Sequence, residues 1–164
     1  MASKVYNAIE TAIVFADSAQ TPDKNLTLSA LASGAGRISA QYDRGAGSKA
    51  GVYKWRATFQ MGTAGVVGQT IDIYISSSDG TNQDGEEGTS DAALGSADSL
   101  KNMVLAGSVV VDTTSTNTDI TASGLCVVPD RYLSVVVDNN TDDALRTDTS
   151  VHSVSLTPVP LEVQ

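Results

Sequence analysis

The sequence predicts an all-β fold, an antiparallel β-sandwich with a jelly-roll-like arrangement, and three observations support this prediction. Segments of alternating polar and apolar residues recur along the 164-residue chain, and such alternation is typical of strands with one buried face. No helical pattern of 10–15 residues separates these segments, so parallel βαβ units are disfavoured. The composition is 41% hydrophobic but only 5% aromatic, which favours a thin core between two sheets.

The first half of the chain contains four predicted strands. An apolar run at residues 11–16 predicts the first, and residues 25–31 and 37–42 predict the next two. A glycine-rich connection at residues 44–51 then leads into the clearest strand, residues 52–61, because alternate side chains there are apolar. The face of this strand that we expect to be buried carries Tyr53, Trp55, Ala57, Phe59 and Met61.

The middle of the chain predicts two strands separated by a long acidic loop. Residues 69–76 alternate as a strand, with Ile71, Ile73 and Ile75 expected to point inward. Residues 77–99 contain four glycines and six acidic residues, which predicts an irregular loop, with one helical turn at residues 90–94 capped by Ser90. Residues 103–112 are an apolar run around Gly107, so that strand is either covered on both faces or bulged.

Three further strands are predicted in the last third of the chain, at residues 125–128, 131–138 and 151–157. The last of them places His152 on the same face as Val154 and Leu156, before two prolines end sheet pairing. In total we expect eight to ten strands. They form a single domain over residues 11–164, which follows an N-terminal arm of residues 1–10.

Charge is distributed unevenly along the chain. The formal net charge is −9, which disfavours free nucleic acid as a partner. Residues 24–56 nevertheless contain six bases and one acid, a net charge of +5, whereas the remainder contains four bases and eighteen acids, a net charge of −14. These bases are either ordinary solvated residues or a basic patch that faces an acidic partner surface. In the second case, Arg44 and Lys49 are expected to contribute to the patch.

The single cysteine and the N-terminal residues define the expected cellular context. Cys126 lies in an apolar run, which predicts a small buried hydrophobic residue, and one cysteine cannot form an intramolecular disulfide. The N-terminal residues show no charged leader followed by a long apolar segment. No stretch approaches the roughly 18 apolar residues of a membrane span. We therefore expect synthesis in the cytoplasm and no membrane partner.

No combination of residues points to catalysis, and we expect neither enzyme activity nor a cofactor. His152 is the only histidine, and its place in a predicted strand indicates a structural role rather than that of a general base. The motifs G-x-S-x-G and H-E-x-x-H and the Walker loop are absent. The glycines at residues 34–36 and 45–47 open no predicted helix, which favours turns over phosphate-binding loops.

Three weaker patterns could indicate a calcium site, a glycosidase site or an aromatic platform, but each has a simpler explanation. Residues 79–87 place Asn82, Asp84 and Glu86 at alternate positions, which suits calcium, but the spacing differs from an EF-hand and a solvated loop is favoured. The clustering of acids in this loop also disfavours the fixed pair of carboxylates that glycoside hydrolysis requires. Trp55 could form a stacking platform, but its apolar neighbours on the strand favour packing in the core.

A family resemblance rests on five segments taken in order. They are A-I-V-F-A-D-S-A-Q-T-P-D at residues 12–23, L-S-A-L-A-S-G-A-G-R-I-S-A-Q-Y-D-R-G-A-G at 28–47, Y-K-W-R-A at 53–57, S-S-S-D-G-T-N-Q-D-G at 76–85 and S-V-S-L-T-P-V-P at 153–160. With these segments the chain resembles small virion proteins of tailed bacteriophages that are encoded among head genes. The similarity covers most of the chain, and it lies in residue texture and segment order rather than in an active-site signature.

The resemblance implies a capsid decoration, or cement, protein. Such a protein is a β-sandwich attached to the outside of an icosahedral shell, often as a homotrimer, and it reinforces the head against internal DNA pressure. The implied partners are the major capsid protein and further copies of the chain, and the implied location is the outer capsid surface of the virion. These families have no catalytic residues to transfer.

This resemblance and the charge pattern together suggest contact residues. The arm of residues 1–10 contains Val5, Tyr6 and Ile9, and we expect it to lie along the shell or a neighbouring subunit, although a frayed terminus is an alternative. Arg44 and Lys49 are expected to face the capsid, with the acidic loop turned toward solvent or a neighbouring subunit.

Two other functions also fit the predicted fold. A carbohydrate-binding or adhesion module of a phage tail would fit a jelly roll, and it predicts an exposed pair of aromatic rings. A tail-tube or baseplate subunit would also fit, and it predicts assembly into rings.

Overall fold

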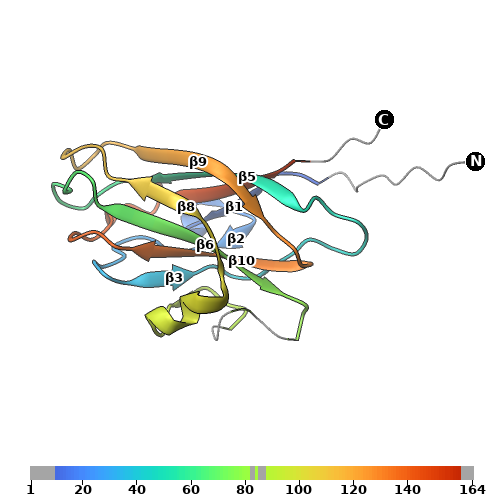
Figure 1. Cartoon of the computed structure of the whole chain (residues 1–164). Helices are drawn as coiled ribbons and strands as arrows, with labels where there is room; N and C mark the ends of the chain where they lie inside the picture. Colours follow the sequence, from blue (N-terminus) through green and yellow to red (C-terminus); the bar gives the residue numbers. More distant parts are fainter. Residues whose placement is uncertain (1–9, 82–83, 85–87, 160–164) are drawn as a thin grey trace, which may run out of the picture.

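Two β-sheets pack face to face in the computed structural model, which describes residues 10–81, 84 and 88–159 (Figure 1). The strands of the five-stranded sheet are β1 (Ile13–Ala16), β2 (Lys24–Asn25), β5 (Val52–Phe59), β9 (Ile120–Val127) and β11 (Ser153–Pro158). The strands of the six-stranded sheet are β3 (Gly36–Ile38), β4 (Tyr42–Asp43), β6 (Thr70–Ser78), β7 (Ala92–Ala93), β8 (Val104–Val110) and β10 (Tyr132–Asn139). Two 3-10 helices, η1 (Ser18–Gln20) and η2 (Ala97–Asn102), complete the described elements. The predicted all-β sandwich is confirmed.

The strand order is that of a jelly roll. The five-stranded sheet has the order β2-β1-β11-β5-β9 and the six-stranded sheet the order β7-β3-β10-β6-β8, with β4 also paired to β10. Eight strands remain when the two-residue strands β2, β4 and β7 are left out. The first of these pairs with the last (β1 with β11), the second with the seventh (β3 with β10), the third with the sixth (β5 with β9) and the fourth with the fifth (β6 with β8). All of these pairs are antiparallel, which is the arrangement of two interlocked Greek keys.

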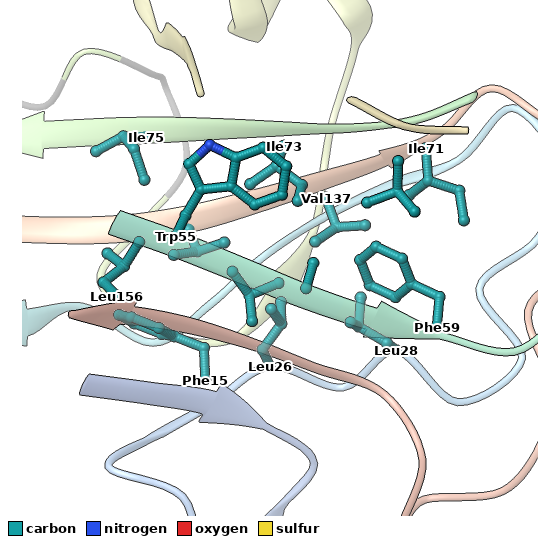
Figure 2. Close-up of a cluster of buried hydrophobic side chains, with 14 of the residues drawn as sticks. Phe15, Leu26, Leu28, Trp55, Phe59, Ile71, Ile73, Ile75, Val137 and Leu156 are labelled. Atoms are coloured by element: carbon teal, nitrogen blue, oxygen red, sulfur yellow. The ribbon is translucent and has the colours of Figure 1, made fainter. Parts of the chain in front are cut away.

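Alternate residues of the central strands fill the space between the sheets (Figure 2). On β5, Trp55 is 3% exposed, and the other apolar residues of the predicted inner face are 1% exposed or less. From the opposite sheet, Ile71, Ile73 and Ile75 of β6 are fully buried. The burial predicted from the alternation of both segments is therefore confirmed, and Trp55 packs in the core rather than forming a platform.

Two predicted strands are shorter than expected. The segment 25–31 pairs only through β2, although Leu26 and Leu28 are fully buried as its alternation suggested. The segment 37–42 is divided between β3 and β4. It is interrupted because Ser39 N donates to Val135 O of β10 whereas Ala40 N donates to Asn25 O, both at 2.8 Å, so the backbone turns from one sheet toward the other.

Most described residues of the region predicted as an irregular acidic loop are irregular, as expected, and part of the region covers the outer face of the six-stranded sheet. The residues of this part include β7, which pairs with β3, and the start of η2, which is drawn below β3 in Figure 1. Met103, directly after η2, packs with Ile38 and Val136 in a second buried cluster. This segment is thus held against the sheet by apolar contacts.

The helical turn predicted at residues 90–94 is wrong. Asp91 does not favour a helix end there, because its Oδ1 accepts a 2.6 Å bond from Arg37 Nε and its Oδ2 accepts from Thr27 Oγ1 at 2.5 Å. Burial alone would raise the pKa of Asp91, but these bonds outweigh burial and lower it. The carboxylate thereby fixes the edge strand β7 in place.

The apolar run around Gly107 forms β8 and contains a bulge. The register between β6 and β8 shifts after Ile73, where Gly107 is the partner, so that Leu105 is the partner of Tyr74. One prediction is that both faces of this strand are covered. It is wrong, because one face is exposed to solvent: Leu105 is 55% and Val110 51% exposed. The alternative prediction, a bulge at Gly107, is confirmed.

Candidate functional site

His152 is a structural residue in the core, as predicted. It is 1% exposed, and its Nδ1 accepts a hydrogen bond from Gln60 N at 3.4 Å. The ring proton therefore lies on Nε2, which donates to Arg146 O at 2.8 Å. Burial lowers the pKa of His152, against the opposing effects of the Arg146 carbonyl and the Asp148 charge. A neutral imidazole that bonds to backbone on both sides fits a structural role.

The lowered pKa of His152 predicts a stability loss in mild acid. The unfolded chain binds a proton below a pKa of about 6.5, whereas the folded chain resists it, so unfolding becomes easier as the pH falls from that value toward the folded-state pKa. Within this window the free energy of unfolding should fall by up to about 1.4 kcal/mol per pH unit. Urea denaturation from pH 7.5 to 5 measures this slope.

The matched variant for this measurement is His152→Gln, whose amide can still donate to Arg146 O. It should remove the part of the pH dependence that belongs to the imidazole. The lowered pKa values of Glu10 and Asp91 place the loss of their stabilisation at lower pH. Equal slopes for the wild type and the variant between pH 6.5 and 5 would contradict the assignment.

The described residues provide no evident metal site. No group of three or more His, Cys, Asp or Glu side chains among them could hold a metal ion. Of the three residues considered for calcium, Asn82 and Glu86 lie outside the described residues. The third, Asp84, uses its Oδ2 to accept a 2.8 Å hydrogen bond from Ser77 N, so this carboxylate has a local structural role.

Cys126 matches its structural prediction, and so do the predicted glycine turns except at Gly36, which begins β3. Cys126 is 5% exposed, and burial raises the pKa of its thiol to about 11, so it is not a thiolate at neutral pH. Gly34, Gly45 and Gly47 have positive φ angles of 67°, 78° and 97°, which suits turns.

No helix of the described chain is long and apolar enough to cross a membrane.

The most elaborate polar cluster of the described residues surrounds Arg44. Its guanidinium donates from Nη1 to the carbonyl oxygens of Val128, at 3.2 Å, and Asp130, at 2.8 Å. Nη2 donates to the carbonyl of Ala50, and Nε donates to Tyr53 Oη at 3.0 Å. The side chain is only 2% exposed. The expectation that Arg44 faces a capsid from an exposed patch is wrong, because the guanidinium is enclosed by its own fold.

Glu10 completes this cluster and connects the N-terminal segment to it. Its Oε1 accepts from Tyr53 Oη at 2.6 Å and from Arg44 Nε at 3.3 Å, and its Oε2 accepts from Ala50 N at 2.8 Å. Burial alone would raise the pKa of Glu10, but these hydrogen bonds and the Arg44 charge lower it overall. We call Glu10, Arg44 and Tyr53 the Glu10 anchor. The predicted arm boundary therefore moves, because Glu10 belongs to the sandwich.

The remaining predicted contact residues lie close to the Glu10 anchor or outside the described residues. Lys49 is half-buried and forms no ion pair with a described residue. Together with Arg44 it lines two hollows of about 180 and 170 Å³. Arg131, which also lines the first hollow, is paired with Asp43. Because the Arg44 guanidinium is bonded as well, Lys49 is the cation of these hollows without an ion pair to a described residue. Val5, Tyr6 and Ile9 lie outside the described residues, so their contacts stay a prediction.

The sequence contained little signal for the Glu10 anchor. Glu10 and Arg44 are 34 residues apart, and three of the acceptors of Arg44 are backbone carbonyls, which carry no residue-type pattern. Tyr53 was predicted to be buried, and a buried tyrosine needs a partner for its hydroxyl. That requirement was the only hint of a polar group at this end of the core.

Comparison with known proteins does not extend these observations. No protein-family model matches the chain, and no curated protein matches it either.

Proposed function

We propose that the chain is a virion structural protein that binds the outer surface of an icosahedral phage capsid and bridges neighbouring capsomers. It would act as a homotrimer or another small oligomer and would have no catalytic role. The resemblance of its segments to small phage virion proteins is the starting point for this proposal. The jelly roll supports it as a rigid docking scaffold, since His152 and Arg44 are bonded within the fold.

The structural observation that carries the proposal furthest is the Glu10 anchor. Three hydrogen bonds to Glu10 fix the point from which residues 1–9 continue. That point lies close to Lys49, which shares a hollow with Glu10. An arm held at a defined point can engage a neighbouring subunit while the sandwich contacts the shell, and such simultaneous contacts strengthen one another. Binding to the assembled shell alone would also stabilise that shell by mass action.

The rival function as a carbohydrate-binding module predicts exposed aromatic rings. Among the described residues, Tyr53, Trp55 and Phe59 are buried. The rings of Tyr42, Tyr74 and Tyr132 are half-buried. No observation on the described residues therefore favours this rival over the capsid protein.

The proposal is tested with capsid shells of the phage that encodes the chain, prepared without it. Purified full-length protein should bind these shells in large copy number, and electron microscopy should show it on the outer head surface. A variant that lacks residues 1–9 but retains Glu10 should bind about tenfold more weakly, because one of several simultaneous contacts is lost.

Thermal melting provides the control for the shortened chain, which should unfold like the full chain because the Glu10 anchor is intact. Absence of binding to shells, or location of the protein on tails in a few dozen copies, would contradict the capsid proposal. Binding that is unchanged by the deletion would contradict the role of the arm alone.

A further inference from the structure

The five-stranded sheet differs in charge from the rest of the molecule. The chain has 19 acidic and 10 basic residues, yet none of the five strands of this sheet contains Asp or Glu. Their charged residues are Lys24, Lys54 and Arg56. The six-stranded sheet instead contains Asp43, Asp72 and Asp138. Acidic residues are thus absent from the strands of one layer of the sandwich, although Asp23 of a connecting segment accepts from Val14 N of β1.

Lys54 and Arg56 project from the outer face of this layer. They are exposed and alternate with the buried residues of β5. Neither side chain forms an ion pair with a described residue, whereas five other bases do. Those five are Arg37, Arg44, Lys101, Arg131 and Arg146. In a chain with an excess of acids, two neighbouring cations without a partner indicate that their counter-charge comes from another molecule.

Exposed apolar side chains lie beside these cations. Leu125 of β9 is the cross-strand partner of Lys54 and is 65% exposed. Val127 is the partner of Val52 and is 54% exposed. Val159, which is 37% exposed, donates its N–H to Val52 O at 2.9 Å. An apolar row therefore crosses three neighbouring chain segments next to the two cations, and an apolar patch bordered by polar residues is typical of protein interfaces.

The strand at the edge of this sheet, β9, has no charge, proline or bulge against association, but it lies beside β8 of the other sheet. β9 has eight residues, I-T-A-S-G-L-C-V, with no charged residue and no proline, and its pairing with β5 contains no register shift. Solvent-facing edge strands commonly carry a charge, a proline or a bulge that prevents pairing with other chains. The neighbouring edge strand β8 has a bulge. Because β8 contacts β9, the outward-facing side chains of β9 rather than its edge are what a partner can reach.

A hollow on this face has the chemistry of a carboxylate site. It measures about 180 Å³ and is lined by Arg56, Thr121, Ala122 and Ser123. The guanidinium provides parallel donors that match a carboxylate, and the two hydroxyl groups can add further hydrogen bonds. A carboxylate is thus the group that best complements this hollow.

We infer that the outer face of the five-stranded sheet, with Lys54, Arg56, Leu125 and Val127 on its β5 and β9 side, is a docking surface for an acidic protein surface. The partner presents carboxylates to the two cations and an apolar side chain to Leu125 and Val127. This inference deepens the proposed function and rests on it only for the identity of the partner, the capsid. It also orients the sandwich, because the six-stranded sheet and its covering segment then face away from the shell.

The size of this face agrees with attachment through several copies. The five strands have two to eight residues each, and with about 3.3 Å per residue and about 4.8 Å between strands they present roughly 450 Å². This is less than the ~800 Å² that each partner buries in a standard stable interface. One copy would bind weakly. Several linked copies, or one copy with its arm engaged, would bind firmly.

The first test uses capsid shells prepared without the protein, and it compares two single charge reversals with the same change in net charge. Lys54→Glu should weaken shell binding about tenfold, as expected for a contact residue. Lys101→Glu is the matched control, since Lys101 is 69% exposed on η2, and it should change binding less than about twofold. Leu125→Ser should weaken binding as Lys54→Glu does. Equal binding by the Lys54 and Lys101 variants would overturn the inference.

If the wild type does not bind shells, the proposed function is contradicted but the docking surface is not. A second probe then tests the docking surface by itself. A random copolymer of glutamate and tyrosine supplies carboxylates and apolar rings, and its contacts are mapped by amide NMR shifts. Shifts confined to β5 and β9 that are lost in Lys54→Glu would support the docking surface. Shifts elsewhere or none would overturn it, as would equal binding of duplex DNA at this face, which would indicate a nucleic-acid surface.

Discussion

Replacing Arg44 with Met should destabilise the protein by about 3–5 kcal/mol, because the variant removes one partner of a buried ion pair. Met approximates the length of the arginine stem, but it leaves the carbonyls of Ala50, Val128 and Asp130 without this donor. It also removes the cation and one of the three donors of the Glu10 carboxylate. For a chain of this length the loss corresponds to a decrease in melting temperature of roughly 10 °C. Chemical and thermal denaturation at pH 7 measure both quantities.

Lys49→Met is the matched control, since Lys49 also lines both hollows but forms no ion pair with a described residue. It should change the free energy of unfolding by less than about 0.5 kcal/mol. Adding Glu10→Gln to the Arg44 variant should cost less than the sum of the two single changes, because the two groups interact directly. An Arg44→Met protein that melts like the wild type would contradict a buried structural cluster.

This result bears on how attachment experiments are designed. A charge reversal at Arg44 would place a carboxylate beside Glu10 in an enclosed site, so reduced capsid binding would report a damaged fold. Lys49, Lys54 and Arg56 are better probes because none of them forms an ion pair with a described residue. The hydrogen bond from Arg131 has the larger effect in lowering the pKa of Asp43, and the Lys49 charge only adds to it. Substitution of these three bases changes the charge presented to a partner and leaves the packing of the sandwich intact.

The strands that the sequence identified best are those whose side chains alternate between core and solvent. In β5, and in β6 as far as Ile75, every second residue is buried, so the period of the sequence matches the geometry of the strand. Ser76, Ser77 and Ser78 at the end of β6 are all buried, which the alternation did not predict. The segment 25–31 shows the limit of this reasoning. Leu26 and Leu28 point inward, but only Lys24 and Asn25 pair with a neighbouring strand. Periodicity reports which side chains are buried, whereas pairing depends on a neighbour that the local sequence does not contain.

The functional surfaces depended on information that no local segment holds. The basic stretch at residues 24–56 was visible, but the fold separates its members. Arg44 is enclosed and Arg37 bonds to Asp91, whereas Lys54 and Arg56 remain exposed. The lack of acids on the surrounding face appears only when β5 is placed between β9 and β11. The order of strands in the sheet therefore carried the decisive information.

A second large effect is expected where Trp55 joins the two sheets. Its Nε1 donates to Ala106 O of β8 at 2.9 Å, and its indole lies against Gly107 of β8 and Gly124 of β9. In Figure 2 the ring extends from β5 toward the isoleucines of β6. Trp55→Ala should destabilise the protein by about 3–5 kcal/mol through lost contacts and the cavity that remains. Denaturation in urea measures this change.

Gly124→Ala provides a test of the same contact from the other side. An added Cβ would lie 2.7 Å from Nε1 and 3.0 Å from Cε2 of Trp55, so overpacking should destabilise the protein by about 1–3 kcal/mol. Gly51→Ala is the matched control, because a Cβ there meets no atom within 4 Å. In a Trp55→Ala background the added methyl of Gly124→Ala meets no ring and its cost should disappear. If the effects of the two changes on the free energy of unfolding are instead additive, the Trp55 indole is not the reason for glycine at position 124. The contact between β8 and β9 would then depend on other residues.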